Sequence, residues 1–90
     1  MQDIIDAIRQ FILSTALVGE APENLRNDMA LITGGLLDSL AALGLVSFLE
    51  KKYSIELDVD DTSIERFDSI ADIAATVARK LSVGAGAGKD

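Results

Sequence analysis

Apolar residues recur at steps of three and four positions along three segments of this chain, residues 3–18, 39–53 and 69–82. In an α-helix this spacing gathers the apolar side chains on one side, where they can pack against other helices. Aromatic residues are scarce, with three Phe and one Tyr, so the core must consist mainly of aliphatic side chains. The chain is therefore expected to form packed α-helices rather than a β-sandwich.

Start and stop signals divide the chain into four predicted helices. Gly19 ends the first helix, and Ser39 is a natural N-cap for the second. A short third helix is expected over residues 62–67, with Asp61 or Thr62 as its cap, before the last helix begins. Together these signals predict an all-α bundle with three longer helices, one short third helix and a long first loop.

The predicted helices and connections form one domain over residues 1–82, followed by a flexible Gly/Ala-rich tail over 83–90. The buried face of the second helix is expected to contain Leu40, Leu43, Val46, Leu49 and Tyr53, with Leu45 adding to it. The connection over residues 20–38 carries several apolar residues that should fasten it to the bundle. Ser69 resembles the first residue of a capping box and should begin the last helix.

The residue types missing from the chain exclude most catalytic chemistry. There are no cysteines and no histidines, which removes disulfides, thiol nucleophiles, common zinc sites and the usual general base near neutral pH. Asp60 and Asp61 are assigned to a solvated loop rather than to acid–base catalysis. Near-matches to a calcium loop and to a phosphate-binding loop lack required residues, so no metal site is predicted. The chain is accordingly expected not to be an enzyme.

Charge and hydropathy narrow the range of partners. Fifteen acidic against eight basic residues give a net charge of −7, which disfavours binding to nucleic acid. No apolar run approaches the roughly 18 residues of a membrane span, and the first residues lack the basic region of a secretion signal. The expected location is therefore the cytoplasm. An acidic helical module that binds a basic partner without being modified is one interpretation of this composition.

The segment from Gly34 to Leu40 brings an Asp-Ser pair to the start of the second predicted helix. The hydroxyl of Ser39 should face solvent there, where another enzyme can modify it. Free N–H groups and the positive end of the helix dipole favour a phosphate ester at such a position. An ordinary N-cap serine without modification is the alternative interpretation of these residues.

Residues on both sides of Ser39 extend this pattern along the chain. They are Leu31-Ile32-Thr33-Gly34-Gly35-Leu36-Leu37-Asp38-Ser39-Leu40, then Leu43, Leu45-Val46, Leu49-Glu50 and Tyr53, then Ile55, Glu65-Arg66-Phe67 and Ser69-Ile70. Over residues 4–82 this arrangement resembles the acyl and peptidyl carrier protein family. The resemblance implies a four-helix carrier-protein bundle.

The resemblance also implies that Ser39 carries 4′-phosphopantetheine, transferred from coenzyme A by a separate, magnesium-dependent phosphopantetheinyl transferase. The terminal thiol of this arm would hold an acyl or aminoacyl group as a thioester, and malonyl-type or glyceryl-type loads also remain open. Asp38 and Leu40 match the residues that flank the attachment site, which implies a role in recognition by the transferase. Loading enzymes and downstream biosynthetic enzymes would be the other partners of this monomeric carrier.

The second predicted helix departs from carriers of fatty-acid synthesis, which show several acids on its exposed side. Its exposed stripe is expected to contain Ala41, Gly44, Phe48 and Lys51, with Val46 and Ser47 as further docking residues. A Phe among small residues indicates docking through apolar contact, and a single exposed or partly tucked Phe without a docking role is the alternative. The departure favours a free-standing carrier of polyketide or nonribosomal-peptide biosynthesis over a fatty-acid carrier.

Overall fold

The computed structural model describes residues 2–16, 19 and 21–87 of the 90-residue chain. Its elements are, in order, α1 (Gln2–Thr15), the 3₁₀ turn η1 (Pro22–Asn24), α2 (Ser39–Tyr53), α3 (Ile64–Phe67) and α4 (Ile70–Ala87). The described residues contain no strand. The predicted all-α class is confirmed, together with the short third helix and the long first loop.

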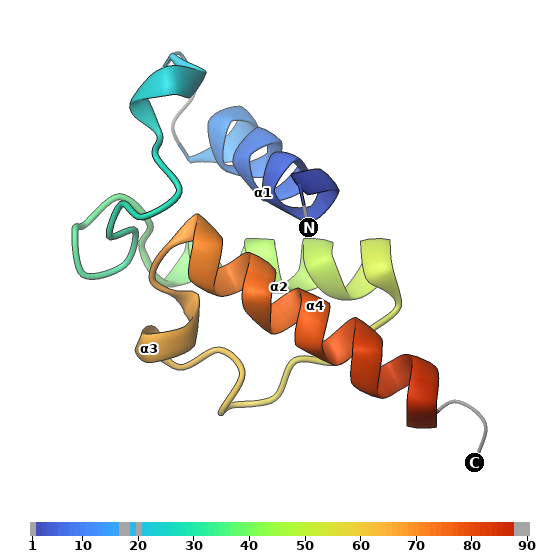
Figure 1. Ribbon diagram of the computed structural model, residues 1–90. Coiled ribbons are helices and arrows are strands. Elements are labelled where there is room, and N and C mark those ends of the chain that lie inside the picture. The colour runs from blue at the N-terminus through green and yellow to red at the C-terminus, as the bar shows by residue number, and fades with distance from the viewer. Residues whose placement is uncertain (1, 17–18, 20, 88–90) are drawn as a thin grey trace.

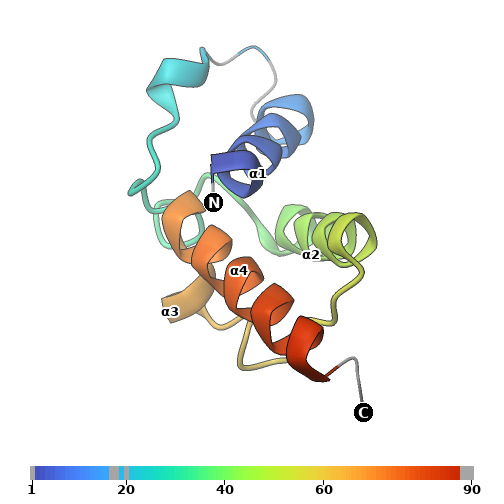
Figure 2. The ribbon, with the colours of Figure 1, turned by 45° about the vertical axis from the view of Figure 1, so that its right-hand side comes forward.

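Three helices, α1, α2 and α4, form the body of the molecule, and α3 is a single turn beside them. α1 packs on both α2 and α4, while α3 packs on α4. In Figure 1, α4 passes in front of α2, and Figures 1 and 2 both show α3 at the N-terminal end of α4. The long connection runs away from the end of α1 and returns to the start of α2. The first turn of α2 therefore lies at the same end of the bundle as α3.

The core joins all the helices and is built almost entirely of aliphatic side chains. Ile8 and Ile12 of α1 are fully covered, as are Ile73 and Val77 of α4. Phe67 of α3 is the largest fully buried side chain. The long connection contributes the buried side chains of Leu25, Leu31 and Leu37 and the partly buried side chains of Met29, Ile32 and Leu36. The prediction that apolar residues fasten this connection to the bundle is confirmed.

The buried face of α2 differs from the predicted one. Leu45 and Leu49 are fully buried, but Leu40 and Leu43, which the spacing assigns to the core, are 78% and 64% exposed. The assignment of Leu40 and Leu43 was wrong because apolar residues occupy nearly every side of this helix, so their spacing does not single out one direction. α2 consequently presents two large leucine side chains to solvent.

The ends of the helices follow the predicted signals with differences. α1 ends at Thr15 rather than at residue 18, and residues 17 and 18 lie outside the described part. The Ser69 hydroxyl accepts a 3.0 Å hydrogen bond from the Asp72 N–H, which confirms that Ser69 caps α4. α4 continues to Ala87, beyond the predicted end at 82, although Gly84 and Gly86 are poor helix formers.

This longer α4 takes in the first residues that were expected to form a flexible tail. The backbone of residues 83–87 is helical, so the predicted end of the last helix was wrong. Residues 88–90 lie outside the described part of the chain. The division into a carrier domain and a tail at residue 83 stays a prediction.

The start of α3 also differs from the prediction. The helix begins at Ile64, and the N-cap position belongs to Ser63 rather than to Asp61 or Thr62. Asp61 is not solvated either, because only 3% of its surface is exposed. Its carboxylate is held by cations from neighbouring helices, whereas the adjacent Asp60 is exposed as expected.

Candidate functional site

The first turn of α2 is built around Asp38 and displays Ser39. The Asp38 side chain accepts a 2.8 Å hydrogen bond from the Ala41 N–H, and its backbone carbonyl accepts one of 2.9 Å from the Ala42 N–H. Asp38 is therefore the N-cap, and Ser39 is the first helical residue. The prediction that Ser39 itself is the cap was wrong, because Asp38 already supplies the capping oxygen. Ser39 is exposed, as expected.

A tight turn before Asp38 fixes the direction in which the chain enters α2. Gly35 has φ +80°, a conformation that glycine adopts without steric cost. At Gly34 an added Cβ would collide with the carbonyl oxygen of Ala30. The N–H groups of Leu36 and Leu37 both donate to the carbonyl of Leu31, at 2.8 and 2.9 Å. Because Leu37 is buried, this turn delivers Asp38 and Ser39 to the surface from a fixed anchor.

Asp68 fastens this turn to the junction between α3 and α4. One carboxylate oxygen of Asp68 accepts hydrogen bonds from the N–H groups of Ile32 and Thr33, at 2.7 and 2.9 Å. The other accepts one of 2.6 Å from the Thr33 hydroxyl. The Asp68 carbonyl also accepts from the Leu31 N–H. No sequence pattern indicates this role, because Asp68 lies 35 residues beyond Thr33.

Acid stability should reflect the contacts of Asp68. Hydrogen bonds from the Thr33 hydroxyl and from backbone N–H groups hold the pKa of Asp68 below its ordinary value of 3.8. A carboxylate with a lowered pKa stabilises the fold above its unfolded pKa, and this contribution is lost as the pH falls through the folded pKa. Urea denaturation should therefore show a smaller loss of unfolding free energy in Asp68→Asn than in the wild type between about pH 5 and pH 3. Equal losses would contradict this assignment.

A groove opens directly beside Ser39, between α2 and the segment that leads into α3. It has a volume of about 470 Å³. We call it the Ser39 groove, and its lining includes Ser39, Leu43, Val46, Leu57, Val59 and Phe67. Most of this lining is apolar, so the groove can accept an apolar group that is tethered to Ser39 through a longer arm. A second groove of about 480 Å³ lies between α1 and α2 and includes Asp38 and Leu40 in its lining.

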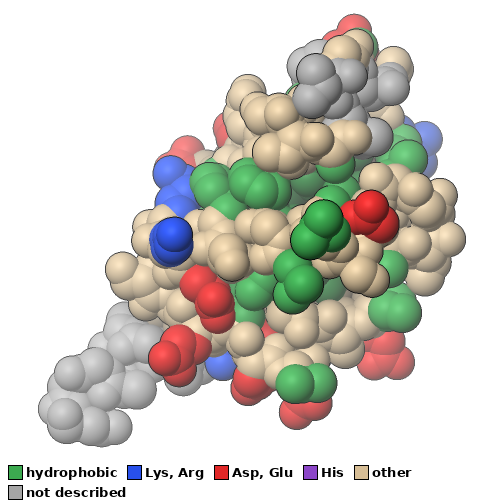
Figure 3. Space-filling view, turned by 180° about the vertical axis from the view of Figure 1, so that it is seen from behind, with side chains coloured by type: hydrophobic (Ala, Val, Ile, Leu, Met, Phe, Trp, Pro, Cys, Tyr) green, Lys and Arg blue, Asp and Glu red, His purple; other side chains and the backbone are tan. Residues whose placement is uncertain are grey.

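Four large apolar side chains are exposed at this end of the molecule. They are Leu40 and Leu43 of α2, Val59 of the following loop and Ile64 of α3, with exposed fractions of 78%, 64%, 85% and 53%. We call them the apolar rim. Figure 3 shows the α2 side of the molecule, where hydrophobic side chains gather and acidic side chains lie around them. Large apolar side chains that stay exposed near one another are typical of a contact site for another molecule.

The predicted docking stripe on α2 is only partly exposed. Gly44, Ser47 and Lys51 are exposed, whereas Ala41, Val46 and Phe48 are half-buried. The Phe48 ring stacks on the Phe11 ring of α1, with 4.7 Å between ring centroids and 24° between ring planes. The expectation of an exposed Phe48 was therefore wrong, because this ring finds an aromatic partner on α1. The alternative of a Phe tucked into the bundle describes the structure.

The sequence matches no family model and no curated protein. The structure, however, matches the solution structure of a holo acyl carrier protein from Nitrosomonas europaea, with a TM-score of 0.74 and 28% sequence identity. The match covers 91% of this chain and 99% of that protein. The fold is that of an acyl carrier protein, and this match supports the resemblance to the carrier protein family that the sequence shows.

Proposed function

We propose that this chain is a carrier protein that holds acyl or aminoacyl intermediates as thioesters on a 4′-phosphopantetheine arm joined to Ser39. The observation that carries the proposal is the exposed Ser39 hydroxyl in the first turn of α2, within a fold that matches a holo acyl carrier protein. The carrier itself performs no chemistry on its load. Enzymes that attach, extend and remove the load are its partners.

The residues around Ser39 suit an attached phosphodiester. A helix leaves its first backbone N–H groups without acceptors inside the helix, and at this end the helix dipole favours negative charge. In α2 the Ala41 N–H already donates to Asp38, so the N–H groups of Ser39 and Leu40 are the ones available to a phosphate oxygen. The arm would supply the thiol that a chain without cysteine lacks.

The Ser39 groove gives an apolar load a place on the carrier. Ser39 is part of the groove lining, and Val46, Leu57 and Phe67 form apolar parts of its wall. A tethered chain that folds back into the groove removes its apolar surface from water, at a gain of about 0.8 kcal/mol for each buried methylene. The bundle would thus hold the load between visits to its partners.

Docking is proposed to rely on apolar contact. Glu50 is the only acidic residue of α2, and its carboxylate is half-buried and accepts a 2.9 Å hydrogen bond from the Leu57 N–H. α2 therefore offers exposed leucines to a partner in place of exposed acids. This surface supports a free-standing carrier of polyketide or nonribosomal-peptide biosynthesis over a carrier of fatty-acid synthesis.

The test of the proposed function is loading by a transferase. The protein is incubated with coenzyme A, magnesium and a broad-specificity phosphopantetheinyl transferase, and its intact mass is then measured. The mass should increase by one phosphopantetheine arm. A folded protein that gains no mass would contradict the proposal and would favour the alternative, an unmodified acidic module that binds a basic partner.

Docking through the apolar rim predicts a specific kinetic defect. Leu43→Glu should raise the KM of the transferase for the carrier about tenfold, because losing one buried leucine contact costs roughly 1.5 kcal/mol. The matched control is Ala75→Glu, which adds the same charge at an exposed position of α4. The KM values are obtained from initial rates of arm transfer. Equal KM values for the two variants would contradict docking at the rim.

A further inference from the structure

We infer that Asp61 is a positioning residue that holds one wall of the Ser39 groove against α4, so that α4 controls how closely the groove covers a tethered load. The inference rests on the proposed function, because it takes the groove as the place of the load. Asp61 lies in the loop between α2 and α3. It is the only strongly buried carboxylate among the described residues.

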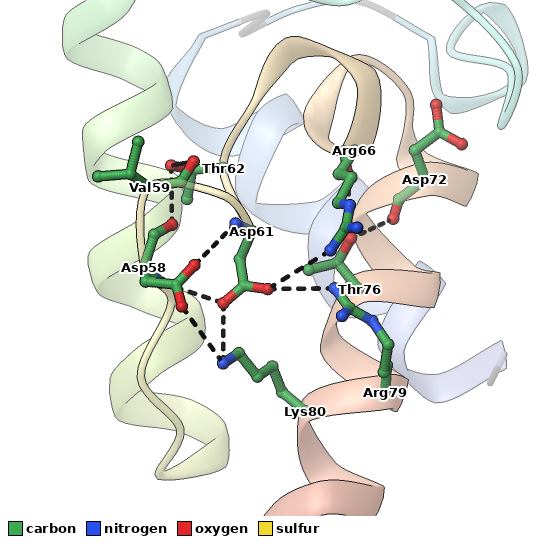
Figure 4. A network of polar contacts seen from close by, with 9 residues as sticks. All are labelled: Asp58, Val59, Asp61, Thr62, Arg66, Asp72, Thr76, Arg79 and Lys80. Carbon is green, nitrogen blue, oxygen red and sulfur yellow. Dashed lines mark hydrogen bonds and ion pairs between the residues drawn. The ribbon is translucent and has the colours of Figure 1, made fainter.

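Three cations converge on the Asp61 carboxylate, as Figure 4 shows. Oδ2 lies 2.8 Å from Nζ of Lys80, and Oδ1 lies 3.1 Å from a guanidinium nitrogen of Arg79. Arg66 of α3 approaches Oδ1 at 4.0 Å. Two of the three cations come from α4. The Asp61 side chain therefore links the loop to α4, a long helix that does not itself line the groove.

The same loop closes on itself through Asp58. The Asp58 N–H donates to the Asp61 carboxylate at 3.1 Å, and the Asp61 N–H donates to the Asp58 carboxylate at 3.0 Å. Lys80 also lies 4.0 Å from the Asp58 carboxylate. In addition, the Thr62 hydroxyl donates to the Asp58 carbonyl at 3.2 Å. The segment over residues 58–62 is thus a single braced unit, and Lys80 lies beside both the exposed Asp58 carboxylate and the buried Asp61 carboxylate.

This braced unit is also a wall of the Ser39 groove. Asp58, Val59 and Thr62 are part of the groove lining. Each lies within three residues of Asp61, whose side chain points the other way, toward α4 (Figure 4). A shift of Asp61 away from Lys80 and Arg79 must therefore move the wall relative to α2. The charge cluster of Asp61, Lys80 and Arg79 therefore fixes the width of the groove from the α4 side, and it does so without contacting the load.

Replacing the carboxylate tests whether it holds the wall. Asp61→Asn keeps the shape of the side chain and removes its charge, and Lys80→Met removes the closest cation from the α4 side. Hydrogen exchange of the unmodified proteins should become faster over residues 57–63 and stay unchanged in α1. The control is Asp60→Asn, which removes the neighbouring exposed carboxylate. Unchanged exchange over residues 57–63 in both variants would overturn the inference.

The effect on a load is tested with two acyl groups of different length. Decanoyl and acetyl arms are attached from the corresponding coenzyme A thioesters, and cleavage of each thioester by hydroxylamine is followed by intact mass. Asp61→Asn should be cleaved several-fold faster than the wild type with the decanoyl load, whereas the acetyl load is too short to reach the groove and should show no difference. A decanoyl thioester that is cleaved at the same rate in Asp61→Asn and in the wild type would overturn the inference, as would an equal acceleration of both loads, because the acetyl load does not depend on the groove. Failure of the wild type to accept any arm would instead overturn the proposed function, and the exchange measurement would still decide the role of Asp61.

Discussion

Ser39→Ala is expected to abolish attachment of the phosphopantetheine arm while leaving the fold intact. The variant removes the only atom of this residue that can form the phosphodiester. Its stability should stay within about 0.5 kcal/mol of the wild type, because the cap of α2 is the Asp38 carboxylate and not the Ser39 hydroxyl. Intact mass after incubation with the transferase measures loading, and urea denaturation measures stability.

Two further variants distinguish the effect of losing the Ser39 hydroxyl from the effect of disturbing the start of α2. Ser14→Ala removes an exposed hydroxyl of α1 and should load fully. Asp38→Ala should cost about 1 kcal/mol of stability through loss of the N-cap and should slow loading, because the first turn of α2 would fray. Full loading of Ser39→Ala would show that the arm is attached elsewhere, and the proposed function would then be wrong in its central residue.

The turn that presents Ser39 at the start of α2 could be predicted because all of its determinants are local. The glycines at 34 and 35, the aspartate at 38 and the following apolar run lie within a short stretch of sequence. They specify a turn and the start of a helix, whatever the packing of the rest of the chain. The exchange of roles between Asp38 and Ser39 was missed because both residues are good N-caps. Only the backbone conformation, extended at Asp38 with ψ 179°, decides between them.

The exposed surface of α2 could not be predicted from spacing alone. Nearly every position from Leu40 to Leu49 is apolar or small, so several helix faces were equally suitable for the core. Contacts with other helices decide which face of α2 is buried. Phe48 turns toward Phe11 of α1, and Leu45 and Leu49 enter the core. Leu40 and Leu43 are consequently left on the outside, where the docking proposal needs apolar side chains.

The charged residues that organise the site escaped prediction for a different reason. Asp61 and Asp68 look like ordinary loop acids in the sequence, yet their partners are 18 and 35 residues away. Burial alone would raise the pKa of Asp61, but the hydrogen bond from Lys80 and those shared with Asp58 outweigh it and lower that pKa to about 2. Such pairing depends on how α3 and α4 pack, which no local pattern reports.

Phe67→Ala is expected to destabilise the protein by about 3–5 kcal/mol, the usual cost of truncating a buried phenylalanine. The ring is 1% exposed and is the only buried side chain of α3, and a four-residue helix has almost no stability without tertiary contacts. Because small domains are stable by only about 5–15 kcal/mol, this single change should remove a large part of the total.

The matched control for this variant is Ile64→Ala in the same short helix. Ile64 is 53% exposed, so its truncation should cost less than about 1 kcal/mol. Urea denaturation of both variants and the wild type gives the unfolding free energies, with an unchanged slope confirming that the same surface unfolds. Since Phe67 also lines the Ser39 groove, the remaining folded Phe67→Ala protein should shelter a decanoyl load less well than Ile64→Ala does. Similar stabilities for the two variants would contradict the claim that the Phe67 ring holds α3 in place.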